Sequence, residues 1–112
     1  MILWTALALA DPVTATRHAL VVGADDGGAE RTRLRFAESD AERMGDVLTE
    51  LGGVPDSNLE VLKAPSLAGF RASVEALGDR IRAGPQPSSA LVYYSGHSDR
   101  KGLLLQDEIY PY

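Results

Sequence analysis

Short apolar runs alternate with amphipathic stretches along this chain of 112 residues. The runs cover residues 18–23, 59–62 and 90–95, and each begins or ends beside a glycine, an asparagine or a serine. Continuous apolar runs of this length, next to turn-forming residues, are typical of buried β-strands. The stretches between these runs carry apolar residues at helical spacing. The pattern therefore predicts the order strand, helix, strand, helix, strand.

The first helix is predicted to begin near Ser39. Ser39 and Glu42 have the spacing of a capping box, in which the hydroxyl accepts from a first-turn amide and the carboxylate bonds back. Gly52 and Gly53 then favour the left-handed conformation that ends many helices. The expected buried stripe consists of Ala37, Ala41, Met44, Val47, Leu48 and Leu51.

The second helix is predicted over residues 66–83. The glycine, prolines and serines of residues 84–89 break it. After the third strand, residues 102–105 and 109–110 are predicted to form a short β excursion about a turn at residues 106–108. The apolar stripe of this second helix consists of Phe70, Val74, Leu77 and Ile81.

These elements predict one α/β domain over residues 17–112, with a three-stranded, mostly parallel sheet and flanking helices. Parallel strands need crossover connections, which the two helices provide. A parallel sheet is normally covered on both faces, and two helices cover three strands only thinly. We therefore expect an incomplete doubly wound fold in which one sheet edge stays open.

The first ten residues, Met1 to Ala10, carry no charged side chain and are almost all apolar or small. They are too few to span a bilayer, which takes about 20 apolar residues in a helix. They match the apolar core of a signal peptide that is cleaved before Asp11, with residues 11–16 as a leader into the fold. We expect a periplasmic or extracellular protein without a transmembrane segment. The alternatives are an apolar first strand or a misplaced start site, either of which leaves the protein in the cytoplasm.

The composition excludes several kinds of partner and site. The formal net charge is -5, so no overall electrostatic attraction favours a nucleic-acid partner. The chain has no cysteine, which excludes disulfides, thiolate metal ligands and a thiol nucleophile within it. Its two histidines, His18 and His97, are too few for a histidine-based zinc site, and no cofactor is expected.

His97 is the first candidate for chemistry. It follows the third predicted strand directly, and ligands and catalytic groups of open α/β sheets gather beyond the carboxyl ends of strands. Gly96 allows a sharp turn and the neighbouring serines leave the imidazole accessible. A histidine there can move protons at neutral pH. The alternative is a loop histidine that only contacts solvent.

The segment Tyr93-Tyr94-Ser95-Gly96-His97 closely resembles the histidine motif of metacaspases and their bacterial caspase-like relatives. Three further stretches, residues 18–28, 34–41 and 102–110, resemble the family's first strand and loop, the opening of its first helix and its hairpin. The resemblance covers residues 17–112 and implies an incomplete caspase-hemoglobinase-like fold. It corresponds to the first half of the large catalytic subunit.

The resemblance implies a cysteine-type endopeptidase that acts on peptide or protein substrates. His97 is then the base and acid of a Cys-His dyad, and the amide of Ser98 stabilises the oxyanion. Asp40 and Ser95 match pocket residues that hold a basic substrate side chain. Asp40 has an equally simple structural explanation, because an aspartate in a first helical turn complements the helix dipole.

The chain departs from the family in lacking the nucleophile. In the family the cysteine follows the next helix and strand, so we expect it on a later segment or on a separate chain. The alternatives are an inactive remnant or a non-catalytic module that binds basic peptides through Asp40. A flavodoxin-like or receiver domain is a third interpretation. The loop that contains Asp25 and Asp26 is predicted to be a tight surface turn, since it lacks the spacing of a calcium or phosphate loop.

Overall fold

A computed structural model of the protein describes residues 15–112. The predicted order of elements is confirmed. The predicted signal peptide and leader residues 11–14 lie outside the described range, and Thr16 already belongs to the first strand. The elements are β1 (Thr16–Ala24), α2 (Ala37–Glu50), the 3-10 turn η1 (Asp56–Asn58), β2 (Leu59–Lys63), α3 (Leu67–Ala83), β3 (Ser88–Gly96), β4 (Gly102–Leu105) and β5 (Glu108–Pro111).

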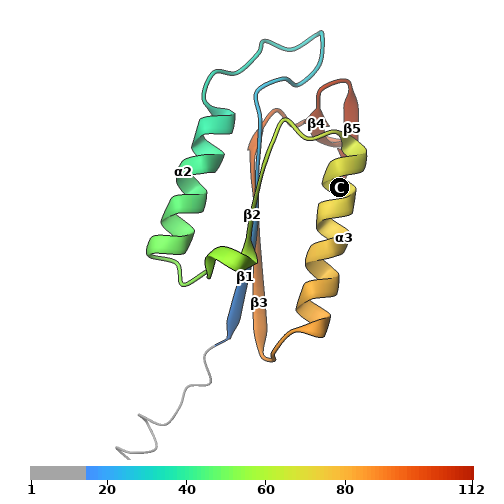
Figure 1. Ribbon diagram of the computed structural model, residues 1–112. Helices are drawn as coiled ribbons and strands as arrows, with labels where there is room; N and C mark the ends of the chain where they lie inside the picture. Colours follow the sequence, from blue (N-terminus) through green and yellow to red (C-terminus); the bar gives the residue numbers. More distant parts are fainter. Residues whose placement is uncertain (1–14) are drawn as a thin grey trace, which may run out of the picture.

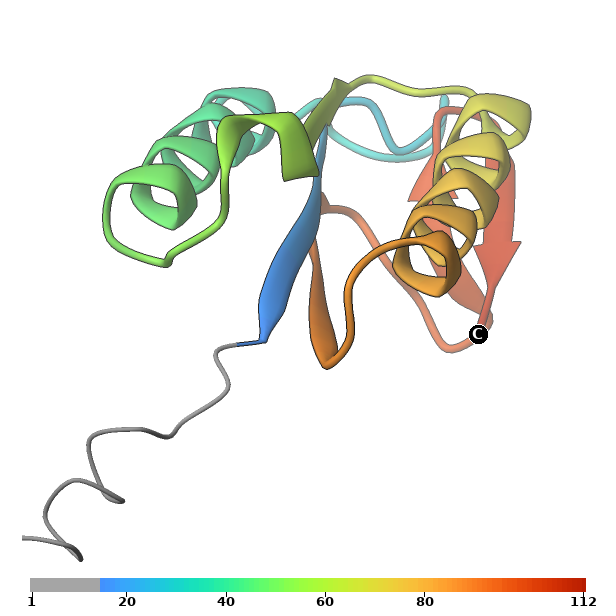
Figure 2. The same ribbon diagram turned by 60° about the horizontal axis from the view of Figure 1, so that its bottom comes forward.

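The core of the fold is a parallel sheet in the order β2-β1-β3. Both strand pairs are parallel, and Leu20 of β1 lies between Glu60 of β2 and Val92 of β3. Helix α2 covers one face of the sheet and α3 covers the other (Figure 1, Figure 2). The predicted class, an α/β fold with a three-stranded parallel sheet flanked by two helices, is therefore confirmed. It is consistent with a partial caspase fold.

The α3 side of the sheet holds the larger core. Ser66 caps the helix, because its Oγ accepts a hydrogen bond from the Gly69 amide at 3.0 Å. The predicted stripe of this helix is confirmed, and Phe70 also stacks edge-on against Tyr110 of β5 with ring centroids 4.6 Å apart. The buried cluster consists of Leu20, Val22, Ala24, Phe70, Leu77 and Leu105.

The predicted start of α2 is wrong. The helix begins at Ala37, and Ser39 lies inside it with its Oγ donating to the Phe36 carbonyl. The Glu38 amide, which a local capping residue would have satisfied, donates instead to the Asp25 carboxylate at 3.1 Å. A cap supplied from thirteen residues away makes the local Ser39–Glu42 spacing irrelevant.

The predicted buried stripe of α2 is only partly right. Ala37 and Ala41 are buried as expected, but the third buried position is Gly45, while Leu51 is 83% exposed. The helix lies close to the sheet, since a Cβ on Gly23 of β1 would sit 2.5 Å from the Ala37 carbonyl oxygen. Small residues therefore form this contact, and the larger apolar residues of the predicted stripe point partly to solvent.

Strand β3 forms one edge of the sheet. Among residues 15–112 no strand pairs with its outer edge, and it contains no charged residue and no proline. Leu91 is 45% exposed and Val92 is 48% exposed, and these neighbours point to opposite faces. Natural edge strands are usually protected by charge, proline or short length. The expected open edge is thus present at β3.

Candidate functional site

The carboxyl edge of the parallel sheet brings His97 together with two loops. Ala24 at the end of β1 aligns with Gly96 at the end of β3, so residues that follow both strands meet at one edge. The loop between β1 and α2 and the β4–β5 hairpin lie at this same end (Figure 1). His97 occupies the position that sequence reasoning predicted for it.

The imidazole of His97 is held on one side. Its Nε2 lies 2.7 Å from the Thr32 carbonyl oxygen. A carbonyl oxygen can only accept, so Nε2 carries the hydrogen and Nδ1 keeps its lone pair. No described residue forms a hydrogen bond with Nδ1. The ring thus has one fixed nitrogen and one nitrogen available as a base.

Gly27 packs against the side chain of His97. A Cβ at this position would lie 2.5 Å from Cδ2 of His97 and 2.7 Å from its Cγ, closer than side-chain atoms can approach. The absence of a side chain at Gly27 therefore lets the loop and the imidazole stay in contact.

The backbone of His97 is also fixed. The Tyr94 hydroxyl lies 2.7 Å from the His97 carbonyl and 3.0 Å from the Leu104 carbonyl, and the Leu104 amide donates to the His97 carbonyl at 3.0 Å. Burial raises the pKa of Tyr94 to about 12, so the phenol is a neutral donor at physiological pH. These bonds join the end of β3 to the β4–β5 hairpin.

The aspartate-rich loop connects the site to α2. The Asp25 carboxylate accepts from the Glu38 amide and the Glu38 carboxylate accepts from the Asp25 amide, both at 3.1 Å. The Gln106 amide of the hairpin donates to the Asp26 carbonyl at 3.0 Å. Asp25 is only 9% exposed, so the predicted surface turn is in fact partly buried. The loop thus links the end of β1 to α2 and to the hairpin, because its carboxylate and carbonyl oxygens accept hydrogen bonds from both.

Ser98 and Ser95 lie on either side of His97 at this edge. Ser98 is exposed and bridges to Leu103, and no described residue accepts from its amide. Ser95 aligns with Gly23, at which α2 approaches the sheet, so Ser95 belongs to the α2 face. The two serines are brought to the histidine end, but neither forms a hydrogen bond with the imidazole.

Asp40 lies in the first turn of α2, away from the imidazole. Its nearest charged partner is Arg43, at 4.0 Å, in an exposed contact between helix neighbours. Within residues 15–112 no hydrogen bond joins Asp40 to Ser95 or His97. Asp40 thus lies in the first turn of α2, with Arg43 as its charged neighbour and no hydrogen bond to the other predicted site residues.

A cavity of about 430 Å³ opens beside the loop and the hairpin, and sequence reasoning did not find its lining. Gly27 and Arg31 contribute from the loop, and Asp99 and Asp107 from the segment after His97. Hydrogen bonds from the amides of Lys101 and Gly102, with the charge of Arg31 at 3.8 Å, lower the pKa of Asp99. Neither Asp40 nor Ser95 lines this cavity.

In the described part of the chain no helix is long and apolar enough to cross a membrane. The histidine, aspartate and glutamate side chains of residues 15–112 form no group of three that could hold a metal ion.

The geometry agrees with the outcome of comparison with known families. Residues 16–112 match the family model of the caspase domain. No curated protein matches the chain at a significant level. The family match extends over nearly all of the described residues and contains the histidine, the loop and the hairpin. The chain belongs to the caspase-domain family.

Proposed function

We propose that this chain is the histidine-bearing part of a metacaspase-like cysteine endopeptidase, with His97 as the base and acid of the Cys-His dyad. The observation that carries the proposal is the state of the imidazole. Its Nε2 is held by the Thr32 carbonyl, while Nδ1 has no partner among the described residues. An imidazole oriented on one side by an acceptor is prepared to take a proton on the other.

In this proposal Nδ1 of His97 takes the proton of a cysteine thiol. The thiolate attacks the peptide carbonyl, the amine leaves with the proton that His97 returns, and water then resolves the acyl-enzyme. The carbonyl of Thr32 stabilises the imidazolium that forms in between. The amide of Ser98, which no described residue engages, supplies a hydrogen bond to the oxyanion.

The cysteine has to come from outside these 112 residues, because the chain contains none. We propose that it arrives on a segment or separate chain that adds a strand to the outer edge of β3. The uncharged edge and the exposed Leu91 and Val92 support this, since an added strand would satisfy the backbone and cover both side chains. A parallel strand there would end beside His97.

The proposed substrate is a peptide with a basic side chain, held by Asp40 and Ser95 at the α2 side. The Asp40 carboxylate is about half exposed, and its contact with Arg43 is long enough to be exchanged for a substrate cation. Asp99 and Asp107 add acidic groups on the other side of the loop. Negative charge on both sides favours arginine or lysine over aspartate next to the cleaved bond.

The test combines the chain with the proposed cysteine-bearing polypeptide. The coding DNA after Tyr112 is read for an Asp-Ala-Cys-like segment, and the encoded polypeptide is mixed with the full chain. We expect cleavage of a fluorogenic arginine peptide, and its loss by a factor of about 1,000 or more in His97→Asn. His18→Asn is the matched control and should retain activity. Cleavage that survives His97→Asn would contradict the assignment.

A second candidate function is supported by the absence of cysteine from the chain. A caspase domain without a nucleophile can still bind a peptide, using Asp40 as the contact. Binding of an arginine peptide to the full chain alone, lost in Asp40→Asn and retained in His97→Asn, would favour this function. The peptidase proposal predicts the same binding and differs in requiring hydrolysis, on addition of the cysteine-bearing polypeptide, that is lost in His97→Asn.

A further inference from the structure

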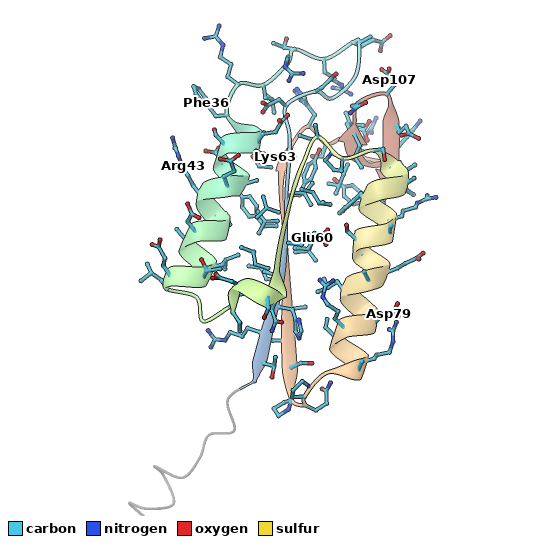
Figure 3. The ribbon with its side chains drawn as sticks, viewed as in Figure 1. Phe36, Arg43, Glu60, Lys63, Asp79 and Asp107 are labelled. Atoms are coloured by element: carbon cyan, nitrogen blue, oxygen red, sulfur yellow. The ribbon has the colours of Figure 1, made fainter. Side chains whose placement is uncertain are left out.

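A second cavity lies between β2 and α3, and the proposed peptidase chemistry does not use it. It has a volume of about 430 Å³ and contains polar groups of Glu60, Ser73 and Arg80. Ala72 and Ala76 of α3 supply an apolar wall, whereas the side chain of Leu59 points to α2 on the other face of the sheet. Figure 3 shows Glu60 in the gap between β2 and α3, whereas Asp79 of the same helix points outward.

Arg80 is the first sign that the cavity lacks an occupant. Its Nε is fully buried and has no hydrogen-bond partner, and no carboxylate of residues 15–112 lies within 4.0 Å of its guanidinium. Arg82, on the same helix, is exposed and pairs with Asp79 at 2.6 Å. Arg80 lines the cavity without an ion-pair partner, so an anionic group is expected beside its guanidinium and not beside Arg82.

Glu60 provides the opposite charge in the same cavity. One of its carboxylate oxygens accepts from the Ser73 hydroxyl at 2.9 Å, and Ser73 is only 9% exposed. Although Glu60 and Arg80 line one cavity, no ion pair joins them. The cavity therefore holds a fixed negative pole and an unpaired positive pole with space between them.

His18 adds an independent observation on the same side of the sheet. It precedes Leu20 by two positions, so it shares the face of Leu20 and of its neighbour Glu60. His18 is 5% exposed, and both ring nitrogens are buried without partners. Buried unpaired polar atoms are rare in folded proteins, and His18 shares the sheet face of Glu60 although it does not line the cavity.

We propose that this cavity binds a free, zwitterionic α-amino acid with an apolar side chain. Its carboxylate bonds to the Arg80 guanidinium, its ammonium group bonds to the Glu60 carboxylate, and its side chain packs on Ala72 and Ala76. The volume falls in the range of small-molecule sites, about 300–1,000 Å³. Residues inside a peptide lack both charges, so the site selects free amino acids and is distinct from the peptide site at His97.

The test is an NMR titration of the full, ¹⁵N-labelled chain with three probes. The probes are L-leucine, N-acetyl-L-leucine, which lacks the ammonium group, and L-leucinamide, which lacks the carboxylate. We expect saturable shifts at the amides of Glu60, Ser73 and their neighbours with leucine. Each blocked compound should bind more weakly by about tenfold or more, because each loses one charge-assisted hydrogen bond.

Variants assign each charge to its residue. Glu60→Gln should weaken leucine about tenfold and leave N-acetyl-leucine unchanged, and Arg80→Gln should weaken leucine similarly and leave leucinamide unchanged. Arg82→Gln, the exposed control on the same helix, should change nothing. If Arg80→Gln loses the dispersed spectrum of a folded protein, Arg80→Lys takes its place. The affinities of the three probes for the unsubstituted chain then test the proposal. Equal affinities for the probes, or no saturable shift in a folded spectrum, would overturn the proposal.

Discussion

The two ends of the parallel sheet treat polar groups in opposite ways. At the carboxyl end, Nε2 of His97, the hydroxyl of Tyr94 and the carboxylates of Asp25 and Glu38 have partners, and only Nδ1 of His97 is left available. Toward the amino end, the ring nitrogens of His18 and the Nε of Arg80 have none. The carboxyl end is fixed by hydrogen bonds within the chain, whereas the α3 side near the amino end keeps buried polar groups without partners. The two ends of one small sheet therefore differ in how completely their polar groups are hydrogen-bonded.

The largest effect that tests this comparison is expected at Asp25. Asp25→Ala removes the acceptor of the Glu38 amide and half of the reciprocal pair that connects β1 to α2. We expect the free energy of unfolding to fall by about 2 kcal/mol in urea denaturation. Asp26→Ala removes only a bond to the amide two residues later and should cost clearly less. Equal losses would mean that the Asp25–Glu38 pair has no special role.

The next effect is expected at Tyr94. Tyr94→Phe removes the hydroxyl that contacts the carbonyls of His97 and Leu104. We expect a loss of about 1.5 kcal/mol and broader NMR signals for the His97 ring. Tyr112→Phe alters an exposed ring and should leave both measurements unchanged. An unaltered His97 signal in Tyr94→Phe would show that the bonds to the hairpin do not hold the His97 ring in place.

Toward the amino end of the sheet, a substitution is expected to raise the free energy of unfolding instead of lowering it. His18→Leu replaces two unpaired, buried nitrogens by an apolar side chain of similar volume, and we expect a gain of about 1 kcal/mol in the free energy of unfolding. His97→Leu, the same change at the carboxyl end, removes a satisfied hydrogen bond and should not stabilise the protein. Thermal denaturation of the two variants compares the ends directly.

The smallest effect is confined to alkaline pH. The pKa of Tyr94 is raised from 10.0 to about 12, so its neutral form is preferred in the folded protein. The resulting stability is complete below pH 10.0 and is lost as the pH rises through about 12. We expect one of the four tyrosines to ionise late in an ultraviolet titration, and Tyr94→Phe to abolish that late step. A late step that survives the substitution would assign it to another tyrosine.

The sequence predicted α3 better than α2, and the reason is physical. Helix α3 has a local cap at Ser66 and a stripe of large apolar residues, so nearby residues determine both its start and its buried face. Helix α2 is capped by Asp25 from another segment and approaches the sheet through Ala37, Ala41 and Gly45. A distant cap and a contact made of small residues leave no clear periodic signal.

Only the site residues that lie at or just after the end of a strand could be predicted from the sequence. His97, Ser95 and Ser98 follow from the end of β3, and the structure brings them to one edge. The Thr32 carbonyl that holds the imidazole gives no sequence signal, because every residue has a carbonyl. The cavity residues Asp99 and Asp107 come together through the loop and hairpin, which are separated along the chain.

Gly27 is expected to tolerate substitution poorly, although the sequence gives no sign of this. It offers no functional group, yet any side chain there would meet the ring of His97. A substitution at Gly27 should displace the imidazole while leaving the sheet, both helices and every charged residue in place. Position 27 would thus tolerate as little variation as the histidine it touches, although its contribution is only the space it leaves empty.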